Sequence, residues 1–129
     1  MAENFTVEII TPEKSIIKTE TSEVILPSYE GEIGILKDHI PLITFLRPGL
    51  ISIKNNKPKN FYIEEGTVEF LNNNLLILTS KVNDLSILEG SLIDEFIKNA
   101  EKQIKEIEIS DKEKYLLSYK IETLKSIRK

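Results

Sequence analysis

The sequence predicts an α+β protein: an N-terminal antiparallel β-sandwich, residues 1–85, followed by a C-terminal antiparallel helical hairpin, residues 86–129. Three observations support this class. Apolar and polar residues alternate from Phe5 to about Leu85, as they do along half-buried strands. Turn-forming residues recur there every eight to twelve residues or so, a spacing typical of antiparallel sandwiches and barrels. After Asp84 the apolar period lengthens to about 3.6 residues, which indicates amphipathic helices.

The strands are expected between successive turn signals. The first contains Phe5, Val7 and Ile9, which alternate with residues of the opposite face. Four later segments have strand composition: residues 51–53, 61–63, 68–70 and 75–78. Because residues 75–78 are all apolar, we expect the last strand to be central and covered on both faces.

Residues 24–49, VILPSYEGEIGILKDHIPLITFLRPG, are a β-type segment that we expect to be interrupted by a turn-rich loop carrying the only histidine, His39. Gly31 and Gly34 are interpreted as backbone positions for a tight turn or bulge. Four residues are too apolar for an ordinary solvated loop: Ile33, Ile35, Leu36 and Ile40. This composition predicts a docking edge for another protein. The alternative is a packed corner of the sandwich.

Two helices are expected after the strands. The first begins at a capped start, Ser91 to Asp94, with Glu95 also in its first turn. Its apolar face is formed by Ile93, Ile97, Ala100, Ile104 and Ile107. The second opens at a capping box, Ser110 with Glu113, and its apolar face includes Leu117, Ile121 and Leu124. So short a hairpin must dock to be stable, either as a permanent lid or as a two-state switch.

The composition excludes several kinds of chemistry. The chain has no cysteine, so disulfides and thiolate sites are excluded, and His39 has no second histidine with which to share a metal. The acidic pairs Glu30/Glu32 and Glu64/Glu65 are expected to be solvated rather than catalytic. No phosphate-binding glycine motif occurs. With a net charge of -4, no nucleic-acid footprint is expected, and without a signal peptide or an 18-residue apolar run we expect a soluble chain without direct membrane insertion.

Several motifs in fixed order carry a family resemblance. The segments VEIITPEKSII, VILPSYEGEIGILKDHIPLIT, LRPGLISI and EEGTVEFLNNNLLILTSKV strongly resemble the epsilon subunit of bacterial F-type ATP synthase, equivalent to the mitochondrial delta subunit. The resemblance covers residues 5 to about 82, and NAEKQI, residues 99–104, resembles the end of the family's first helix. It implies a β-sandwich with a helical hairpin. It also implies a non-catalytic rotor-stalk subunit that binds gamma and the c-ring, couples proton translocation to ATP synthesis, and is peripheral on the cytoplasmic face of the bacterial inner membrane.

The resemblance also implies where contacts are made. In the family the EGEIGILKDH segment lies at the c-ring end, so the candidates for contact with the c-ring or gamma are Glu30, Gly31, Glu32, Ile33, Asp38 and His39. Asp38 stands near a position where the family often has glycine or asparagine. We therefore expect interface residues in this segment and no catalytic or metal-binding residue.

Regulation by the hairpin is a further implication. In many members it extends along gamma and inhibits ATP hydrolysis, and some members bind ATP through an I/L-D-x-x-R-A motif. Here Ile93 and Asp94 begin that motif, but Ile97 and Lys98 replace its arginine and alanine, so we expect no ATP or other cofactor. Contact with the alpha or beta subunits would need cations of the second helix: Lys112, Lys114, Lys120 and Lys125.

Three functional hypotheses follow. A rotor-stalk subunit would bind gamma tightly and show no activity alone. A free-standing nucleotide-sensing module would close its hairpin on a ligand, which the missing arginine disfavours. A small sandwich hydrolase would need a carboxylate pair in a cleft, and the lack of aromatic residues near Glu30 or Glu64 disfavours it. The first hypothesis is favoured.

Overall fold

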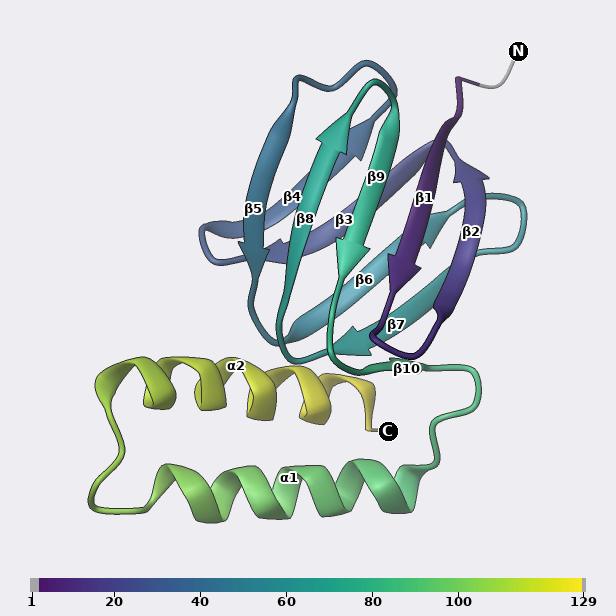
Figure 1. Ribbon diagram of the computed structural model, residues 1–129. Coiled ribbons are helices and arrows are strands. Elements are labelled where there is room, and N and C mark those ends of the chain that lie inside the picture. The colour runs from purple at the N-terminus through teal and green to yellow at the C-terminus, as the bar shows by residue number, and fades with distance from the viewer. Residues whose placement is uncertain (1–2, 129) are drawn as a thin grey trace. The chain divides into compact units, whose positions relative to one another are not determined.

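The computed structural model describes residues 3–128, which form ten strands and two helices (Figure 1). The chain divides into two compact units, the first ending at Ser86 and the second beginning at Ile87. The first unit contains all ten strands of the described chain and the second contains both helices. The predicted fold class, a β-sandwich followed by a helical hairpin, is confirmed.

The strands of the first unit lie in two layers (Figure 1). One layer contains, in spatial order, β5 (Leu42–Leu46), β8 (Gly66–Leu71), β9 (Asn74–Leu78), β1 (Phe5–Ile10) and β2 (Ser15–Thr21). The other contains β4 (Gly31–Leu36), β3 (Glu23–Ser28), β6 (Gly49–Lys54), β7 (Lys59–Ile63) and β10 (Val82–Asp84). The layers join at one corner, where Ser28 of β3 pairs with Leu46 of β5. Of the described pairings, that of β1 with β9 is parallel and the others are antiparallel.

Alternation along the strands builds the core. In β1 the side chains of Phe5, Val7 and Ile9 are buried while the residues between them are half-buried, as the period of two predicts. Phe5 meets Phe70 of β8 edge to face, with 5.5 Å between ring centroids. The core also takes residues from both layers: Val24, Leu26, Ile35, Leu46, Ile51, Ile53, Phe61, Ile63, Val68, Leu75 and Ile77.

The expectation for β9 is wrong in one respect. The strand is internal to its layer, between β8 and β1, and Leu75 and Ile77 are buried. However, Leu76 is only half-buried and Leu78 is 45% exposed, so the second face is not covered. The strand therefore presents apolar side chains outward as well as inward.

The turn-rich loop expected within residues 24–49 is largely a strand. Residues 31–36 form β4, which pairs along its whole length with β3, and Ile35 is fully buried in the core. The tight turn at Gly31 is confirmed by its φ of +123°. A bulge at Gly34 is wrong, because Gly34 lies opposite Ile25 in regular register. Ile33 and Ile35 both pack toward the core, and this burial favours a strand over the turn or bulge that the two glycines suggest.

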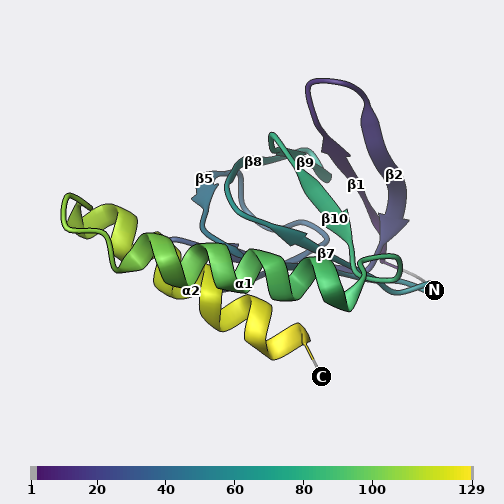
Figure 2. The ribbon, with the colours of Figure 1, turned by 90° about the horizontal axis from the view of Figure 1, so that it is seen from below.

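The second unit is an antiparallel pair of helices, α1 (Gly90–Ile104) and α2 (Asp111–Ile127), which lie side by side in Figures 1 and 2. The capping box of α2 is confirmed: Ser110 Oγ accepts from the Glu113 N–H at 3.1 Å, and the Ser110 N–H donates to the Glu113 carboxylate at 3.4 Å. Ala100 and Leu124, both from the expected apolar faces, are fully buried.

The start and end of α1 differ from expectation. The helix begins at Gly90 with Glu89 as N-cap, so the cap proposed at Ser91 is wrong, and no acidic side chain lies in the first turn. The Glu89 carbonyl accepts hydrogen bonds from the N–H groups of Leu92 and Ile93, so the first turn of α1 closes without a side-chain cap. At the other end, Ile107 lies beyond the helix and is 98% exposed, so it does not belong to the apolar face.

Candidate docking surfaces

The outer side of the β5–β8–β9–β1 layer carries two rows of side chains fixed by strand register. Phe45, Thr67 and Leu78 lie side by side on β5, β8 and β9, and Ile10 of β1 continues the row. The second row runs from Ile43 through Glu69 and Leu76 to Glu8. Adjacent strands are about 4.8 Å apart, so each row is a continuous surface.

This surface is one of the places where the first unit exposes large apolar side chains; another is formed by Leu36, Ile40 and Leu71 at the ends of β4 and β8. Ile43 is 76% and Phe45 58% exposed, and with Leu78, Leu76 and Ile10 they define what we call the outer apolar face. At its edge, a hollow of about 360 Å³ is lined by Ile10, Pro12, Leu78 and Thr79, among others. An apolar patch with an adjoining hollow is a surface suited to docking a protein partner.

The sequence-predicted contact residues fall into two separate places. Glu30 to Ile33 lie at the start of β4, in the turn that joins it to β3, whereas Asp38 and His39 follow its end. A six-residue strand spans about 20 Å, so the two groups are not brought together. Any partner that contacts both must lie along the length of β4.

The first place is a β-turn held by a buried hydroxyl. Ser28 is 2% exposed, and its Oγ donates to the Gly31 carbonyl at 2.6 Å and accepts from the Glu30 N–H at 3.2 Å. Glu30 and Glu32 are exposed, while Ile33 packs against the core. The turn therefore presents two carboxylates on a rigid support, although they do not share one face of a strand as a catalytic pair would. Glu64 and Glu65 are likewise engaged separately, by Tyr62 and by Ser80.

The second place is the turn after β4, where Asp38 has a left-handed backbone with φ +64°. The N–H of His39 donates to the Leu36 carbonyl at 3.1 Å, which closes the turn. The imidazole of His39 packs edge to face on Phe70, with 5.9 Å between centroids, and its Nδ1 lies 2.7 Å from the Ile40 carbonyl. The ring of His39 is therefore held in place by Phe70 and the Ile40 carbonyl.

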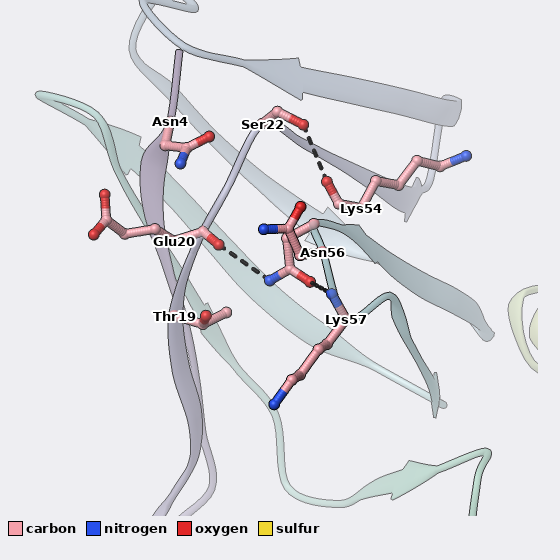
Figure 3. Close-up of a pocket in the computed structure, with 8 residues that line it drawn as sticks. Asn4, Thr19, Glu20, Ser22, Lys54, Asn56 and Lys57 are labelled. Atoms are coloured by element: carbon pink, nitrogen blue, oxygen red, sulfur yellow. Dashed lines mark hydrogen bonds between the residues drawn. The ribbon is translucent and has the colours of Figure 1, made fainter. Parts of the chain in front are cut away.

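A polar hollow of about 570 Å³ lies at another end of the sandwich, between the start of β1 and the β6–β7 turn (Figure 3). Its polar groups tie strand ends together: Ser22 Oγ donates to the Lys54 carbonyl, and Asn55 Nδ2 donates to the Glu20 carbonyl. Figure 3 shows the side chains of Lys54 and Lys57 directed away from one another. The hollow therefore presents no converging set of charges to a ligand.

In the second unit, α1 and α2 are joined by an ion-pair clasp near the open end of the hairpin. Arg128 donates from Nε to Asp94 Oδ1 at 2.8 Å and from Nη2 to Oδ2 at 3.2 Å, a two-pronged pair. Lys125 lies 3.1 Å from the Glu101 carboxylate. A Cβ at Gly90 would lie 2.7 Å from Arg128 Nη1, so the guanidinium rests against the first residue of α1.

The candidate regulatory residues of the hairpin differ in their surroundings. Ile93 is buried and Asp94 is engaged by Arg128, so the two residues that begin the nucleotide motif are both occupied. The lysines of α2 do not form one face. At about 100° per residue, Lys114 and Lys125 lie near each other while Lys112 and Lys120 lie on roughly the opposite side. One flat acidic surface cannot meet all four at once.

The ion pair with Arg128 changes the pKa of Asp94, and this change can be measured. The hydrogen bond from Arg128 holds the pKa of Asp94 below its ordinary value. Arg128→Ala is therefore expected to return that pKa to the ordinary range in a carbon-13 NMR titration of the carboxyl groups. Because the folded-state pKa is depressed, the clasp stabilises the hairpin above the ordinary carboxyl pKa, and this contribution is lost as pH falls through the depressed value.

The control for this titration is Lys112→Ala, which removes an exposed cation from the same helix and should leave the pKa of Asp94 unchanged. An Asp94 titration in Arg128→Ala that matches the wild-type curve would contradict the role of the clasp.

Within residues 3–128, no cluster of three or more histidine or acidic side chains is placed to hold a metal ion. None of the helices in this described part is long and apolar enough to cross a membrane. The fold and its surfaces thus define a two-part interaction protein, a β-sandwich with an outward apolar face and a clasped helical hairpin.

Comparison with known proteins identifies the family. Residues 4–84 match the model of the ATP synthase delta/epsilon chain β-sandwich domain. The chain is 45% identical to an ATP synthase epsilon chain of Pelagibacter ubique, over 98% of this chain and 99% of that one. It is 34% identical to one of Leptospira borgpetersenii, over 90% and 89% of the two chains. The chain belongs to the ATP synthase delta/epsilon chain family.

Solved structures share the fold at low sequence identity. A chain in the mitochondrial ATP synthase of Euglena gracilis superposes with a TM-score of 0.81 at 16% identity, covering 98% of this chain and 82% of that one. A chain from the central stalk and c-ring structure of the Tetrahymena thermophila enzyme gives 0.66 at 15% identity, covering 99% and 98%. The fold of this chain therefore recurs among distant sequences.

Proposed function

We propose that this protein is a non-catalytic subunit of the rotor stalk of an F-type ATP synthase, where it binds gamma and the c-ring and helps to couple proton translocation to ATP synthesis. The observation that carries the proposal is 45% identity to an ATP synthase epsilon chain across nearly the full length of both chains. The same role implies a peripheral position on the cytoplasmic face of the bacterial inner membrane, held by protein partners without direct insertion.

The two kinds of surface suggest two contacts. The outer apolar face is rigid, in register and broad, which suits it to a permanent partner such as gamma. The turn with Glu30, Gly31, Glu32 and Ile33 presents two carboxylates, and the turn with Asp38 and His39 is flanked by exposed Leu36 and Ile40, which suits both to the c-ring or to the rim of the gamma contact. Neither contact needs a catalytic group, a metal ion or a bound cofactor.

The test is to mix the purified protein with its cognate gamma subunit and to compare size-exclusion profiles of the mixture and of each subunit alone. Co-elution as a one-to-one complex is expected. Separate elution, with gamma shown to be folded by circular dichroism, would overturn the proposal. Only the assignment of the fold and the family would then stand.

No ATP binding by the hairpin is expected. A phosphate site of this type needs an available arginine fork, and Arg128, the residue that caps the end of α2, is already paired with Asp94. Titration calorimetry with the isolated protein and Mg-ATP should therefore give no saturable heat at micromolar nucleotide. Saturable binding would contradict this expectation, and its loss in Asp94→Ala would then locate the site.

The hairpin is proposed to act on ATP hydrolysis when α1 and α2 separate and α2 contacts the alpha and beta subunits. Lys114 and Lys125, which lie on the same side of α2, are the pair of cations that could meet one acidic segment of those subunits together. Removing residues 86–129 is expected to raise the hydrolysis rate of the assembled enzyme at unchanged subunit composition. An unchanged rate would exclude the inhibitory role.

A further inference from the structure

Two turns that are distant in sequence carry the left-handed residues of the sandwich. Among the described residues, the non-glycine residues with positive φ are Asp38 at +64°, Asn72 at +51° and Asn73 at +59°. Asp38 lies in the turn between β4 and β5, and the two asparagines form the turn between β8 and β9. Aspartate and asparagine reach the left-handed backbone more readily than other side chains because their short polar groups can make local hydrogen bonds.

The two turns support each other through a reciprocal pair of hydrogen bonds. The backbone N–H of Asp38 donates to Asn73 Oδ1 at 2.7 Å, and Asn73 Nδ2 donates to Asp38 Oδ1 at 2.9 Å. The pairing fixes the orientation of the amide, because the N–H requires an acceptor and the carboxylate oxygen requires a donor. Only a primary amide at position 73 satisfies both partners at once.

The same asparagine is anchored on its other side. Its backbone carbonyl accepts from the Thr6 N–H at 3.0 Å, where β1 enters the sheet. Beside the pair, the His39 ring packs on Phe70, which is buried in β8 next to the β8–β9 turn. Asn73 thus connects the turn carrying Asp38 and His39 to the rigid β8–β9–β1 part of the sheet.

We propose that Asn73 is a positioning residue for docking, which holds the Lys37–Asp38–His39 turn in its left-handed form so that Asp38 and His39 present a preformed contact to the rotor. This inference rests on the proposed function. Because a preformed turn loses little conformational entropy on binding, releasing it weakens association without removing a contact residue. Because the two hydrogen bonds join only two surface turns, losing them should open the turn locally without unfolding the core.

The variant that isolates the pair is Asn73→Gly, since glycine keeps the left-handed backbone and removes only the amide side chain. Its matched control is Asn72→Gly, which makes the same exchange at the adjacent left-handed residue, whose side chain is exposed and lies outside the pair. A third variant, Asn73→Asp, keeps the acceptor for the Asp38 N–H but places a second carboxylate against that of Asp38.

Two measurements are made on each variant. Amide hydrogen exchange of Asp38 and His39, followed by NMR on the isolated protein, reports the state of the turn independently of any partner. Affinity for the purified gamma–c-ring rotor, measured by biolayer interferometry, reports docking. For Asn73→Gly we expect exchange to rise about tenfold at Asp38, whose acceptor is removed, and also at His39, whose N–H closes the turn on the Leu36 carbonyl. Rotor affinity should fall by roughly fivefold, the scale of one or two exposed hydrogen bonds.

The remaining expectations separate positioning from general stability. Core amides of β3 and β6 should keep their protection in Asn73→Gly, Asn72→Gly should behave as wild type in both measurements, and Asn73→Asp should lose more affinity at neutral pH than Asn73→Gly.

Three results would overturn the inference. Unchanged exchange at His39 in Asn73→Gly would show that the pair does not hold the turn. Faster exchange with unchanged rotor affinity would show that the turn has no docking role. Failure of the wild-type protein to bind the rotor would overturn the proposed function itself, and the docking role with it, while the exchange data would still report on the pair.

Discussion

An Ile43→Glu, Phe45→Glu double variant is expected to weaken binding to the gamma subunit by about 100-fold or more. Both side chains project from β5 into the outer apolar face, where a partner would remove them from water. Burying a large apolar side chain is worth about 1.5–3 kcal/mol, and two such anchors together exceed the roughly 2.7 kcal/mol that a hundredfold change requires. A glutamate at either position would instead have to be desolvated. Isothermal titration calorimetry with cognate gamma measures the loss.

The control for this variant is Ile107→Glu, which makes the same exchange at a fully exposed isoleucine between the two helices. It should bind gamma as the wild type does. The double variant should also unfold at the wild-type temperature, because neither side chain contributes to the core. Wild-type affinity in the double variant would remove the outer apolar face from the gamma contact and direct attention to the turns at the ends of β4.

Gly49→Ala is expected to destabilise the sandwich by about 1–3 kcal/mol, which lowers its melting temperature by several degrees. A Cβ at Gly49 would lie 2.5 Å from Cβ and 2.9 Å from Cγ of Pro27. Carbon atoms in contact prefer about 3.5–4.0 Å, and the proline ring has no alternative rotamer into which it could move. The clash falls at the corner where the two layers join, so neither strand can shift without disturbing the other.

Gly34→Ala provides the comparison. Its Cβ would lie 3.4 Å from the Glu23 carboxylate, the flexible end of a side chain, and its backbone is that of a regular strand. Thermal unfolding followed by circular dichroism should show a melting temperature near that of the wild type for Gly34→Ala and a clear decrease for Gly49→Ala. Equal melting temperatures for the two variants would contradict the packing argument at Pro27.

Two kinds of sequence signal predicted elements correctly. The alternation of apolar and polar residues in β1 identifies its buried side chains. The capping box from Ser110 to Glu113 identifies the start of α2, because it is a local interaction between side chain and backbone. The start of α1 was misplaced because Glu89 closes its first turn through a backbone carbonyl, and any residue can supply that group. Local side-chain signals therefore predicted a boundary only where a side chain makes the contact.

The outer apolar face was not predicted for a different reason. In β5 both alternating sets are apolar: Leu46 is buried in the core while Ile43 and Phe45 face outward. A period of two cannot distinguish the inward set from the outward set when both are hydrophobic. The same ambiguity in β9 led to the expectation of cover on both faces. A strand that is apolar in both phases is itself the signal of an outward apolar surface.

The support of Asp38 was equally hidden from sequence. Its partner, Asn73, is 35 residues away, and a single sequence offers no means of pairing an aspartate in one turn with an asparagine in another. The left-handed backbone of Asp38 and the group that stabilises it both become visible only when the strands are in place.

The parallel pairing of β1 with β9 has a consequence for the order in which the chain can fold. β1 finds β2 at once, but its other neighbour is β9, so that Thr6 pairs with Asn74 and Ile10 with Leu78. A two-stranded ribbon is only marginally stable in water. During synthesis the β1–β2 ribbon must therefore wait until residue 78 has left the ribosome, with Phe5, Val7 and Ile9 still unburied. Because the contacts that close the sandwich join distant parts of the sequence, we expect its closure to be slow compared with the folding of a helical pair.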